Sequence, residues 1–477
     1  MAIKDVWIKK MGAHRGSPRI FLDGLQAIRA GFSPGQRFDV EVDGKRVVLS
    51  KNEDGSRVVS SRRKGERDIP VIDINSAELL SVFDGMDAIR VVVGVNGVYL
   101  LPLASEARKV ERLERLSAKL FNGQPLSAGS LAHGGGVLAH AVHTGLADAG
   151  IQCKLEFANE LRDDLLIQAA EHNDVWDDDT AALSMPMQEL AQDEWLLGQL
   201  PKIELLEMGL PCSGASLAGH TKNKLEKMED HEEVGHLVYS ALAIISKTNP
   251  AIVLLENVPR YANTASAQIL RHQFRDMGYE THEAVLDGAD FGCLEARVRW
   301  CMVAVTRGIE FSFQDLAPHA RIVQSLDSVL DQDIRVDDER WRAVEYLKSK
   351  RVRNEAEGNG FKMQFVTPQS TKIGTLRRGY SKGGSTDPRL RHPTDMTKSR
   401  LLTAAEHASV KGVPAALVGG LSETIAHQLL GQGIVYEPFR AAAQRIGECL
   451  LERMTQSALR MEPSFGQMSE RRERHTG

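Results

Sequence analysis

From about residue 127 the chain alternates short apolar runs with amphipathic helical patterns, and this alternation restricts its possible folds more than any other feature. Runs of about four to eight apolar residues are typical of strands buried on both faces, and intervening helices allow such strands to lie parallel. We therefore expect an α/β domain with a doubly wound, mostly parallel sheet. The runs expected as parallel strands are LEFAN (155–159), IELLEM (203–208), AIVLLEN (251–257) and WCMVAV (300–305), with helical patterns such as 163–172 and 234–247 between them.

The first hundred or so residues carry an internal repeat at a shift of 51 positions. Both copies read as a strand, a short helix and two strands around a tight turn, at Asp43-Gly44 in one copy and Asn96-Gly97 in the other. Two such units can bury their apolar faces only against each other, which predicts a small β-rich barrel in residues 1–105. The aligned positions are Ile20, Phe21, Ile28, Phe32, Phe38, Val40, Val42, Val47 and Leu49 against Val71, Ile72, Leu79, Phe83, Ile89, Val91, Val93, Val98 and Leu100.

Changes of pattern divide the remainder of the chain. A polar helical linker is expected at 106–126, the first part of the α/β core at 127–309, and a loop-rich stretch, here called the basic region, at 310–398. Helical periodicity returns at 399–460, and the last residues, 461–477, are expected to form a disordered tail.

Composition excludes several classes of protein. No apolar run reaches the roughly 18 residues that a membrane-spanning helix needs, and the N-terminus lacks the continuous apolar core of a secretory signal. The five cysteines include no Cys-x-x-Cys pair, which argues against a disulfide framework and against a zinc site. These features favour a protein of a reducing cytoplasm.

Positive charge is concentrated in two stretches although the net charge is −5. Residues 361–400 hold nine Lys/Arg against two Asp, and residues 51–67 hold six basic against three acidic residues. Such clusters can bind phosphates locally, and the alternative is a pair of solvated loops. The candidate DNA contacts are Arg377, Arg378, Lys382, Arg389 and Arg391 in the basic region, and Arg62, Arg63 and Lys64 in the expected N-terminal barrel, residues 1–105.

A glycine cluster, Gly134, Gly135 and Gly136, lies between a short strand signal and a helical pattern. Glycines there let the backbone approach a nucleotide-like ligand at a helix N-terminus, although the same cluster could simply form a tight turn. Glu160 ends the next strand, where its carboxylate could accept hydrogen bonds from ribose hydroxyls.

The second loop sends the buried strand 203–208 into Pro211-Cys212 and a turn of small residues. A cysteine at the carboxyl end of a parallel strand faces the crevice where ligands bind. It becomes a nucleophile only where its surroundings favour the thiolate, and the alternative is a buried, inert cysteine.

Two further motifs place an acid and two arginines at the same edge of the expected sheet as the Pro-Cys loop. Glu256 and Asn257 end the run 251–257, where an acid beside a nucleophilic cysteine can protonate a ring nitrogen of a bound base. The alternative is a capping Asn with a surface Glu. Arg297 and Arg299 lie two residues apart, on one face of the entering strand, and can bind a base carbonyl or orient a carboxylate.

In this order the four groups resemble the cytosine-5 DNA methyltransferase family, over about residues 127–460. The family's Pro-Cys loop is matched by Pro211-Cys212, its Glu-Asn-Val by Glu256-Asn257-Val258, and the arginines of its Gln-x-Arg-x-Arg by Arg297 and Arg299. The segments 399–414 and 427–439 also look like the family's last two motifs. Residues 19–50 in turn resemble AbrB-like swapped-hairpin barrels, which suggests DNA binding, with a structural or protein-binding appendage as the alternative.

Some positions depart from the family pattern. Ala132 stands where a Phe packs on the cofactor, Ser213 and Glu295 each stand where the family has Gln, and Gln432 stands where it has Asn. The family's Asp for the adenine amino group has no clear counterpart, and residues 184–186 stand in its place.

The resemblance implies the methyltransferase fold that binds S-adenosyl-L-methionine, and methyl transfer to carbon 5 of a cytosine flipped out of double-stranded DNA, with no metal. It implies that the Cys212 thiolate attacks carbon 6 with Glu256 supporting proton transfer at ring nitrogen 3, and that Arg297 and Arg299 anchor the base and Glu256. Asn257 belongs to the same catalytic set. The basic region is expected to select the target sequence, and the setting is expected to be a bacterial or phage cytoplasm. Open alternatives are a non-catalytic DNA-binding regulator on the same shell, or an enzyme that acts on RNA cytosine or transfers another group. An accompanying restriction enzyme is also left open. The cofactor-binding residues it implies are Gly134, Gly135, Gly136, Glu160, Leu161, Pro211, Leu237, Gln432 and Gly433.

Overall fold

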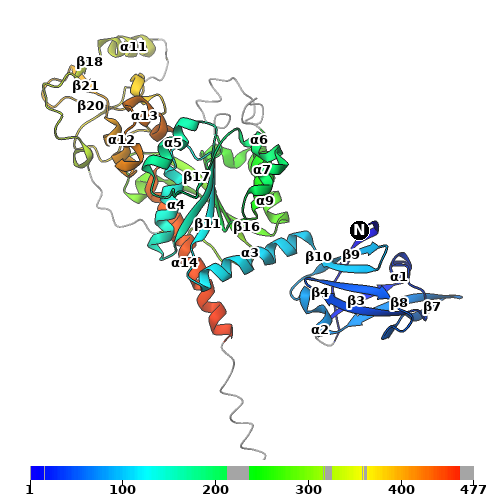
Figure 1. Ribbon diagram of the computed structural model, residues 1–477. Helices are drawn as coiled ribbons and strands as arrows, with labels where there is room; N and C mark the ends of the chain where they lie inside the picture. The colour runs from blue at the N-terminus through cyan, green and yellow to red at the C-terminus, as the bar shows by residue number, and fades with distance from the viewer. Residues whose placement is uncertain are drawn as a thin grey trace, which may run out of the picture. The chain divides into compact units, whose positions relative to one another are not determined.

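The computed structural model describes residues 2–14, 17–211, 236–314, 316, 325–356, 358 and 363–461 (Figure 1). The chain divides into two compact units, Met1–Glu111 and Arg112–Gly477, called here the first and the second unit. In the described parts of both, no helix is long and apolar enough to span a bilayer. The expected tail lies outside the described residues, except for Met461.

The first unit is built from two interleaved copies of one motif. Its six-stranded sheet has the order β1-β9-β10-β5-β4-β6 and its four-stranded sheet the order β2-β3-β8-β7. Both orders have a pseudo-twofold symmetry: each strand of one copy has the position that its counterpart in the other copy has when the sheet is counted from the opposite edge. Each sheet therefore contains strands of both copies. The first copy comprises β1 (Ile3–Lys10), β2 (Gly12–His14), β3 (Ser17–Asp23), α1 (Leu25–Arg29), β4 (Arg37–Asp43) and β5 (Arg46–Lys51). The second comprises β6 (Arg57–Val58), β7 (Ser60–Lys64), β8 (Arg67–Asn75), α2 (Ala77–Leu80), η1 (Ser81–Phe83), β9 (Ala88–Gly94) and β10 (Val98–Pro102).

The shift between the copies changes by one residue along the motif. In β3 and β8, Ile20 pairs with Ile74 and Leu22 with Ile72, and all four side chains are buried. Residue 20 therefore corresponds to residue 72, a shift of 52, whereas Phe32 and Phe83 keep the expected shift of 51. A strand displaced by one residue would turn its apolar side chains outward, so the extra residue is absorbed between the strand and the phenylalanine.

The second unit contains a seven-stranded sheet with the order β13-β12-β11-β14-β15-β17-β16. Its first five strands are parallel, which confirms the doubly wound, mostly parallel fold that the alternation predicts. The strands are β11 (Leu126–Leu131), β12 (Cys153–Glu160), β13 (Ala181–Ser184), β14 (Leu205–Met208), β15 (Ile252–Asn257), β16 (Tyr279–Asp287) and β17 (Val298–Thr306).

The run WCMVAV was wrongly expected to be parallel. It forms most of β17, which runs antiparallel to both β15 and β16. Only residues 288–297 connect β16 to β17, with one 3-10 turn, η4 (Gly288–Phe291). Because a parallel return needs a crossover of about a dozen residues or more, this connection leads the chain back antiparallel.

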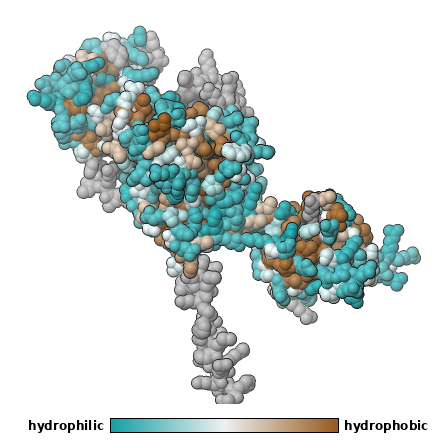
Figure 2. Space-filling view, viewed as in Figure 1, coloured by the Kyte–Doolittle hydropathy of each residue, from teal (hydrophilic) through white to brown (hydrophobic). Residues whose placement is uncertain are grey.

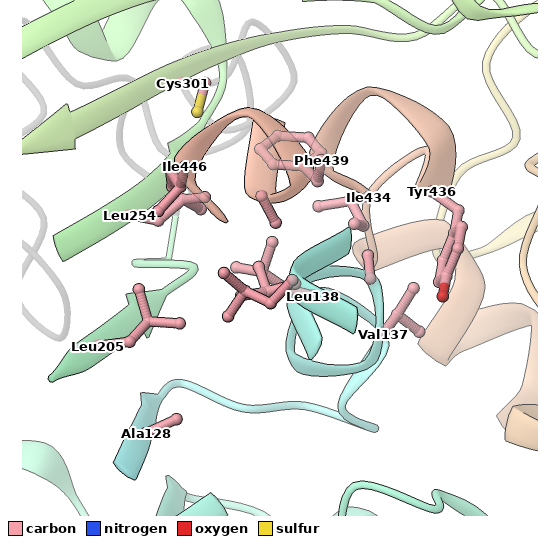
Figure 3. Close-up of a cluster of buried hydrophobic side chains, with 14 of the residues drawn as sticks. Ala128, Val137, Leu138, Leu205, Leu254, Cys301, Ile434, Tyr436, Phe439 and Ile446 are labelled. Atoms are coloured by element: carbon pink, nitrogen blue, oxygen red, sulfur yellow. The ribbon is translucent and has the colours of Figure 1, made fainter. Parts of the chain in front are cut away.

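Helices cover both faces of the sheet (Figure 1). On one face, Ala128, Leu205, Leu254 and Cys301 of the sheet point toward helices α4 and α14, as Figure 3 shows. The side chains of the next residues along β14 and β15, such as Leu206, pack with α9 on the other face. The helices are α4 (Val137–Asp148), α5 (Asp163–His172), α6 (Met187–Gln192), α7 (Glu194–Gln199), α9 (Leu237–Thr248), η3 (Pro259–Asn263), α10 (Ala265–Asp276), α12 (Ala404–Val410), η7 (Ala415–Val418), α13 (Glu423–Gln432) and α14 (Tyr436–Met461).

The expected linker is a helix, α3 (Ala104–Phe121), whose second half is fixed to the sheet of the second unit. Arg112 stacks 3.9 Å from the ring centroid of Tyr279, and Arg115 forms a 2.6 Å ion pair with the buried Glu204. An arginine that donates to several groups at once restrains the helix against the amino-terminal ends of the strands. The C-terminal part of the expected linker is therefore an integral part of the second unit.

The basic region forms a small sheet with the order β18-β21-β20-β19 and a core of its own. Arg400, at the end of β21, makes two 2.6 Å hydrogen bonds to Glu406 of α12, and Thr403 caps the same helix. The expected boundary at 398 falls inside β21, because this strand joins the two parts. The elements are η5 (Leu326–Val329), β18 (Arg342–Ala343), α11 (Glu345–Ala356), β19 (Phe365–Val366), η6 (Tyr380–Lys382), β20 (Arg389–Arg391) and β21 (Lys398–Arg400).

Candidate active site

The carboxyl ends of four parallel strands bring together the loops that the sequence singles out. In the sheet, β12, β11, β14 and β15 are neighbours in this order. They end respectively at Glu160, at the glycine loop, near Pro211, and at Glu256-Asn257. The site is therefore the crevice at this edge, where ligands of open parallel sheets bind.

Packing or backbone conformation favours glycine at all three positions of the glycine loop, and a Cβ at Gly135 would lie 2.2 Å from Leu429 Cδ1. Gly134 and Gly136 have φ of 58° and 74°, values that side chains disfavour, and Gly136 caps the N-terminus of α4. A Cβ at Gly136 would overlap the Asn173 amide and lie 2.7 Å from His133 Nε2. Ala132, in the family's Phe position, also has a positive φ of 52°.

Glu160 is fixed by the loop beside it. The Gly134 N–H donates to Glu160 Oε2 at 2.9 Å, and the Arg162 N–H donates to Oε1 at 3.1 Å. Each carboxylate oxygen retains a further lone pair for a ligand hydroxyl. Of the other expected cofactor contacts, Leu161 is exposed and Leu237 is buried in the first turn of α9. Gln432 is exposed at the end of α13, and Gly433 follows it as the C-cap.

Cys212 lies outside the described residues, as does Ser213. The residues leading to it are held in place, because the Asn257 side chain donates from Nδ2 to the Leu210 carbonyl at 3.0 Å. Asn257 is buried, and its Oδ1 accepts the Val258 N–H at 2.9 Å. Asn257 thus ties the end of β15 to the loop that contains Pro211.

Glu256 forms an ion pair with Arg299 at the sheet edge. The Arg299 Nε lies 2.7 Å from Glu256 Oε1, and both side chains retain a little exposure, 14% and 13%. A Cβ built on Gly209 would lie 3.7 Å from Glu256 Oε2, so this carboxylate borders the strand end that leads to Pro211. A guanidinium on one oxygen leaves the other free to meet a ligand.

Arg297 has different neighbours from Arg299. Its buried guanidinium donates to the carbonyls of Gly431, at 3.0 Å, and Gln432, at 3.4 Å. It also reaches the Leu376 carbonyl, at 3.5 Å. Arg297 thereby joins the loop after α13 to the basic region.

The departure at Glu295 is balanced by a second charge. Glu295 is fully buried, and its Oε2 lies 3.1 Å from Nζ of the equally buried Lys411. The Leu376 N–H donates to Oε1 at 2.8 Å. Burial, together with the positive charge of Arg297, lowers the pKa of Lys411 to about 7, although Glu295 acts in the opposite direction.

The other cysteines do not offer an alternative thiolate. Burial raises the pKa of Cys153 and of Cys301, and Glu256 raises that of Cys301 further. Burial also raises the pKa of Cys449. Cys293 is buried, with its Sγ 3.7 Å from the Lys411 carbonyl. A thiol that stays protonated is a poor nucleophile.

A buried polar cluster of Ser130, His133, Trp176 and Glu207 lies next to the glycine loop and was not predicted from the sequence. His133 Nδ1 lies 2.7 Å from Ser130 Oγ and 3.9 Å from Glu207 Oε1, and the Trp176 indole donates to His133 Nε2 at 3.2 Å. The signal that could have found it is an acid inside the apolar run IELLEM, with a histidine inside the glycine loop.

The expected DNA contacts of the basic region fall into two groups. Arg378 and Lys382 are exposed, and Arg377 is half-exposed and forms a 2.7 Å ion pair with Asp387. Arg391 is partly buried, 4.9 Å from the ring centroid of Phe365. In the view of Figure 2, hydrophilic residues cover most of the visible surface over β18–β21 and α11.

Arg389 does not lie on the surface as expected. It is buried, and its Nε donates to Ser399 Oγ at 2.9 Å. A guanidinium used to join β20 to β21 is not presented to a phosphate, so Arg389 is a structural residue. In the first unit, Arg62 pairs with Asp23 at 2.8 Å and Arg63 is exposed, while only the backbone of Lys64 is described, within β7.

Comparison with known proteins agrees with the resemblance in the motifs. The family model of C-5 cytosine-specific DNA methylases matches residues 143–448, more than half of the chain. Type II methyltransferase M1.ScrFI of Lactococcus lactis subsp. cremoris is 25% identical over 263 residues, which cover 53% of this chain and 64% of that protein. Type II methyltransferase M.MspI of Moraxella sp is 26% identical over 266 residues, 53% of this chain and 57% of its own. The matches therefore span about six tenths of the length of these two relatives.

Solved structures show a similar fold. The S. pombe Dnmt2 methyltransferase superimposes with a TM-score of 0.52 at 18% identity, over 70% of this chain and 99% of its own. The Entamoeba histolytica methyltransferase EhMeth gives a TM-score of 0.51 at 14% identity, with the same coverage. With the family match over residues 143–448, the chain belongs to the C-5 cytosine-specific DNA methylases.

Proposed function

We propose that this chain transfers a methyl group from S-adenosyl-L-methionine to carbon 5 of a cytosine in double-stranded DNA. The observation that carries the proposal is the Glu256–Arg299 pair, 2.7 Å apart, beside the strand end that leads to Pro211-Cys212. Nucleophilic activation of a pyrimidine requires a thiolate that adds to the ring and an oriented acid that protonates it, and this loop and ion pair would supply both.

The residues of the crevice fit the cofactor. Gly134, where a Cβ would meet nothing within 4 Å, leaves room for a ligand near the N-terminus of α4, and Glu160 can accept hydrogen bonds from ribose hydroxyls. Pro211, Leu237 and the segment Gln432–Gly433 would complete the site. When bound, the cofactor supplies an electrophilic methyl group on a positively charged sulfur.

The protein's part in the reaction is to make carbon 5 nucleophilic. The Cys212 thiolate adds to carbon 6, forming a carbon–sulfur bond, while Glu256 supplies a proton at ring nitrogen 3. The electron pair thus placed at carbon 5 would take the methyl group, whose bond to sulfur would break to leave S-adenosyl-L-homocysteine. A base then removes the carbon 5 proton, the carbon–sulfur bond breaks, the proton on nitrogen 3 is returned, and the aromatic ring is restored with the Cys212 thiolate.

The target base has to leave the stack before Cys212 can reach it. Flipping costs a few kcal/mol in a duplex, which the pocket must offset by contacts to the base. In this proposal Arg299 and Glu256 contact the base, and Arg297 and Asn257 position the loops around it. The Asn257 side chain donates to the Leu210 carbonyl, and the Arg297 guanidinium donates to the Leu376 carbonyl.

Target selection is assigned to the basic region. Arg378 and Lys382 are exposed there, and Arg377 is half-exposed, so they are available to phosphates or guanine edges. Exchange of residues 325–398 for the corresponding segment of a relative should move the methylated site to the relative's sequence. A site that stays unchanged would refute the assignment. In the first unit, Arg62 and Arg63 are proposed to add non-specific affinity for DNA.

The proposed activity can be tested by incubating the full-length chain with labelled S-adenosyl-L-methionine and with DNA or RNA duplexes of matched sequence. We expect label in DNA only, at carbon 5 of cytosine, and none with Cys212→Ser. Label in RNA alone would favour the RNA enzyme. DNA binding without any transfer would favour the non-catalytic regulator.

A further inference from the structure

Glu207 is a buried acid with an unsatisfied oxygen in the central strand β14. Its side chain is 2% exposed, its strand neighbours Leu206 and Met208 are apolar, and its Oε1 has no hydrogen-bond partner among the described residues. Burial of a carboxyl oxygen without a partner is unfavourable unless a ligand or another group compensates it. Glu204, in the same stretch, shows the contrast, because it is paired with Arg115 and Lys119.

The side chain of Glu207 is directed to the face that carries the site. Side chains alternate along a strand, so Glu207 shares a face with Leu205, which Figure 3 shows pointing toward α4. Gly209 is on the same face two residues later. A Cβ there would lie 3.7 Å from Glu256 Oε2 and 4.0 Å from the Ala132 carbonyl, so Glu207 lies beneath the gap between the acid and the glycine loop.

The polar cluster that the described residues form around Glu207 gives its Oε1 no hydrogen bond. Because the Trp176 N–H donates to His133 Nε2, a neutral His133 carries its proton on Nδ1, which has Ser130 Oγ at 2.7 Å. Glu207 Oε1 is 3.9 Å away, beyond hydrogen-bond distance. The hydrogen bonds of His133 are therefore to Ser130 and Trp176, and Oε1 of Glu207 is left without a hydrogen bond among the described residues.

Strand order places Glu207 between the two ends of the proposed ligands. Glu160 on β12 marks the ribose end, and Glu256 on β15 marks the target base. The strands between them, β11 and β14, carry Ser130 and Glu207 as direct neighbours. The methyl-bearing sulfur has to lie between the ribose and the base, and hence over these two strands.

We propose that Glu207 is a buried counter-charge for the sulfonium of S-adenosyl-L-methionine, an inference that rests on the proposed function. In a low-dielectric site a charge acts over several ångströms without direct contact. The attraction ends when the methyl group leaves, because S-adenosyl-L-homocysteine is a neutral thioether. Glu207 therefore favours binding of the methyl donor and release of the product.

Calorimetric binding of both compounds to the full-length chain tests this inference. For Glu207→Gln we expect the affinity for S-adenosyl-L-methionine to fall about tenfold, while that for S-adenosyl-L-homocysteine changes less than about twofold. Glu207→Asp keeps the charge and should keep the preference for the donor. The matched control Glu204→Gln makes the same change at the far end of the strand and should leave the ratio of affinities unaltered.

Thermal unfolding without ligand gives a second, independent readout. Removal of an unpaired buried charge should leave the melting temperature of Glu207→Gln equal to or above that of the wild type, whereas Glu204→Gln should lower it. An equal loss of both ligands, or no change in either, would overturn the inference while the proposed function stands. A wild-type chain that binds neither compound would overturn both.

Discussion

The Glu256–Arg299 pair is the residue-scale feature on which the proposed chemistry depends. The 2.7 Å contact fixes the direction of one carboxylate oxygen and leaves the other beside Gly209. Such orientation matters because proton transfer to a ring nitrogen requires hydrogen-bond distance at the moment of attack.

Glu256→Gln should reduce the single-turnover rate of methyl transfer about 10²–10⁴-fold, because the amide cannot supply the proton. Arg299→Lys retains the charge but loses the fork, so an intermediate loss is expected. The control is Arg271→Lys, whose partner Glu283, 2.7 Å away, lies outside the site. A rate for Arg299→Lys no lower than that of the control would contradict the role of Arg299.

Lys411 predicts a pH dependence of stability. Its pKa falls from the ordinary 10.5 to about 7 on folding, so between these values the unfolded chain binds a proton that the folded chain lacks. The free energy of unfolding attributable to this group therefore rises with pH across that window, and the stabilisation is lost as the pH falls to about 7.

Urea denaturation at a series of pH values between neutrality and pH 10 checks this prediction. The neutral double variant Lys411→Gln with Glu295→Gln removes both charges and should show a flatter dependence than the wild type. Identical slopes for the two proteins would show that Lys411 does not titrate in this range.

At the scale of elements, glycines set how closely α14 approaches α4, and Gly145 makes the tightest of these contacts. A Cβ at Gly145 would overlap the Arg440 carbonyl and lie 2.8 Å from the Ala443 Cβ. Both obstacles belong to α14, and a packed helix backbone cannot move aside as a flexible side chain can.

Gly145→Ala should therefore lower the free energy of unfolding by about 1–3 kcal/mol, despite the better helix propensity of alanine. The matched control is Gly198→Ala in α7, where a Cβ meets nothing within 4 Å. That change should be neutral or stabilising by up to about 1 kcal/mol. Urea denaturation measures both, and equal effects of the two variants would rule out the close contact.

For the whole molecule, the proposed division between structural and DNA-contacting basic residues can be tested directly. Arg378→Ala and Lys382→Ala should weaken DNA binding and reduce the slope of log affinity against log salt by about one contact each. Arg389→Ala should instead lower thermal stability, because it removes the hydrogen bond to Ser399. A salt slope unchanged in the first two variants would exclude phosphate contacts at these positions.

Pattern in the sequence determined much of the architecture, because the alternation of strands and helices and the repeat are local signals. The carboxyl ends of parallel strands meet at one edge, so the sequence also predicted that Glu160, Pro211 and Glu256 would converge. The orientation of β17 could not be predicted in this way, since it depends on the length of the connection from β16 and not on the apolar run itself.

Only the tertiary structure decided what each charged side chain does. Arg297 and Arg299 are two residues apart, yet one donates to backbone carbonyls and the other orients Glu256. In the sequence Arg389 is indistinguishable from the other arginines of the basic region, but in the fold it is buried and donates to Ser399. Glu295 departs from the family pattern in the sequence, but in the fold it pairs with Lys411. The sequence determines which side chains are charged. Their burial and their hydrogen-bond partners depend on segments that are distant along the chain and come together only when it folds.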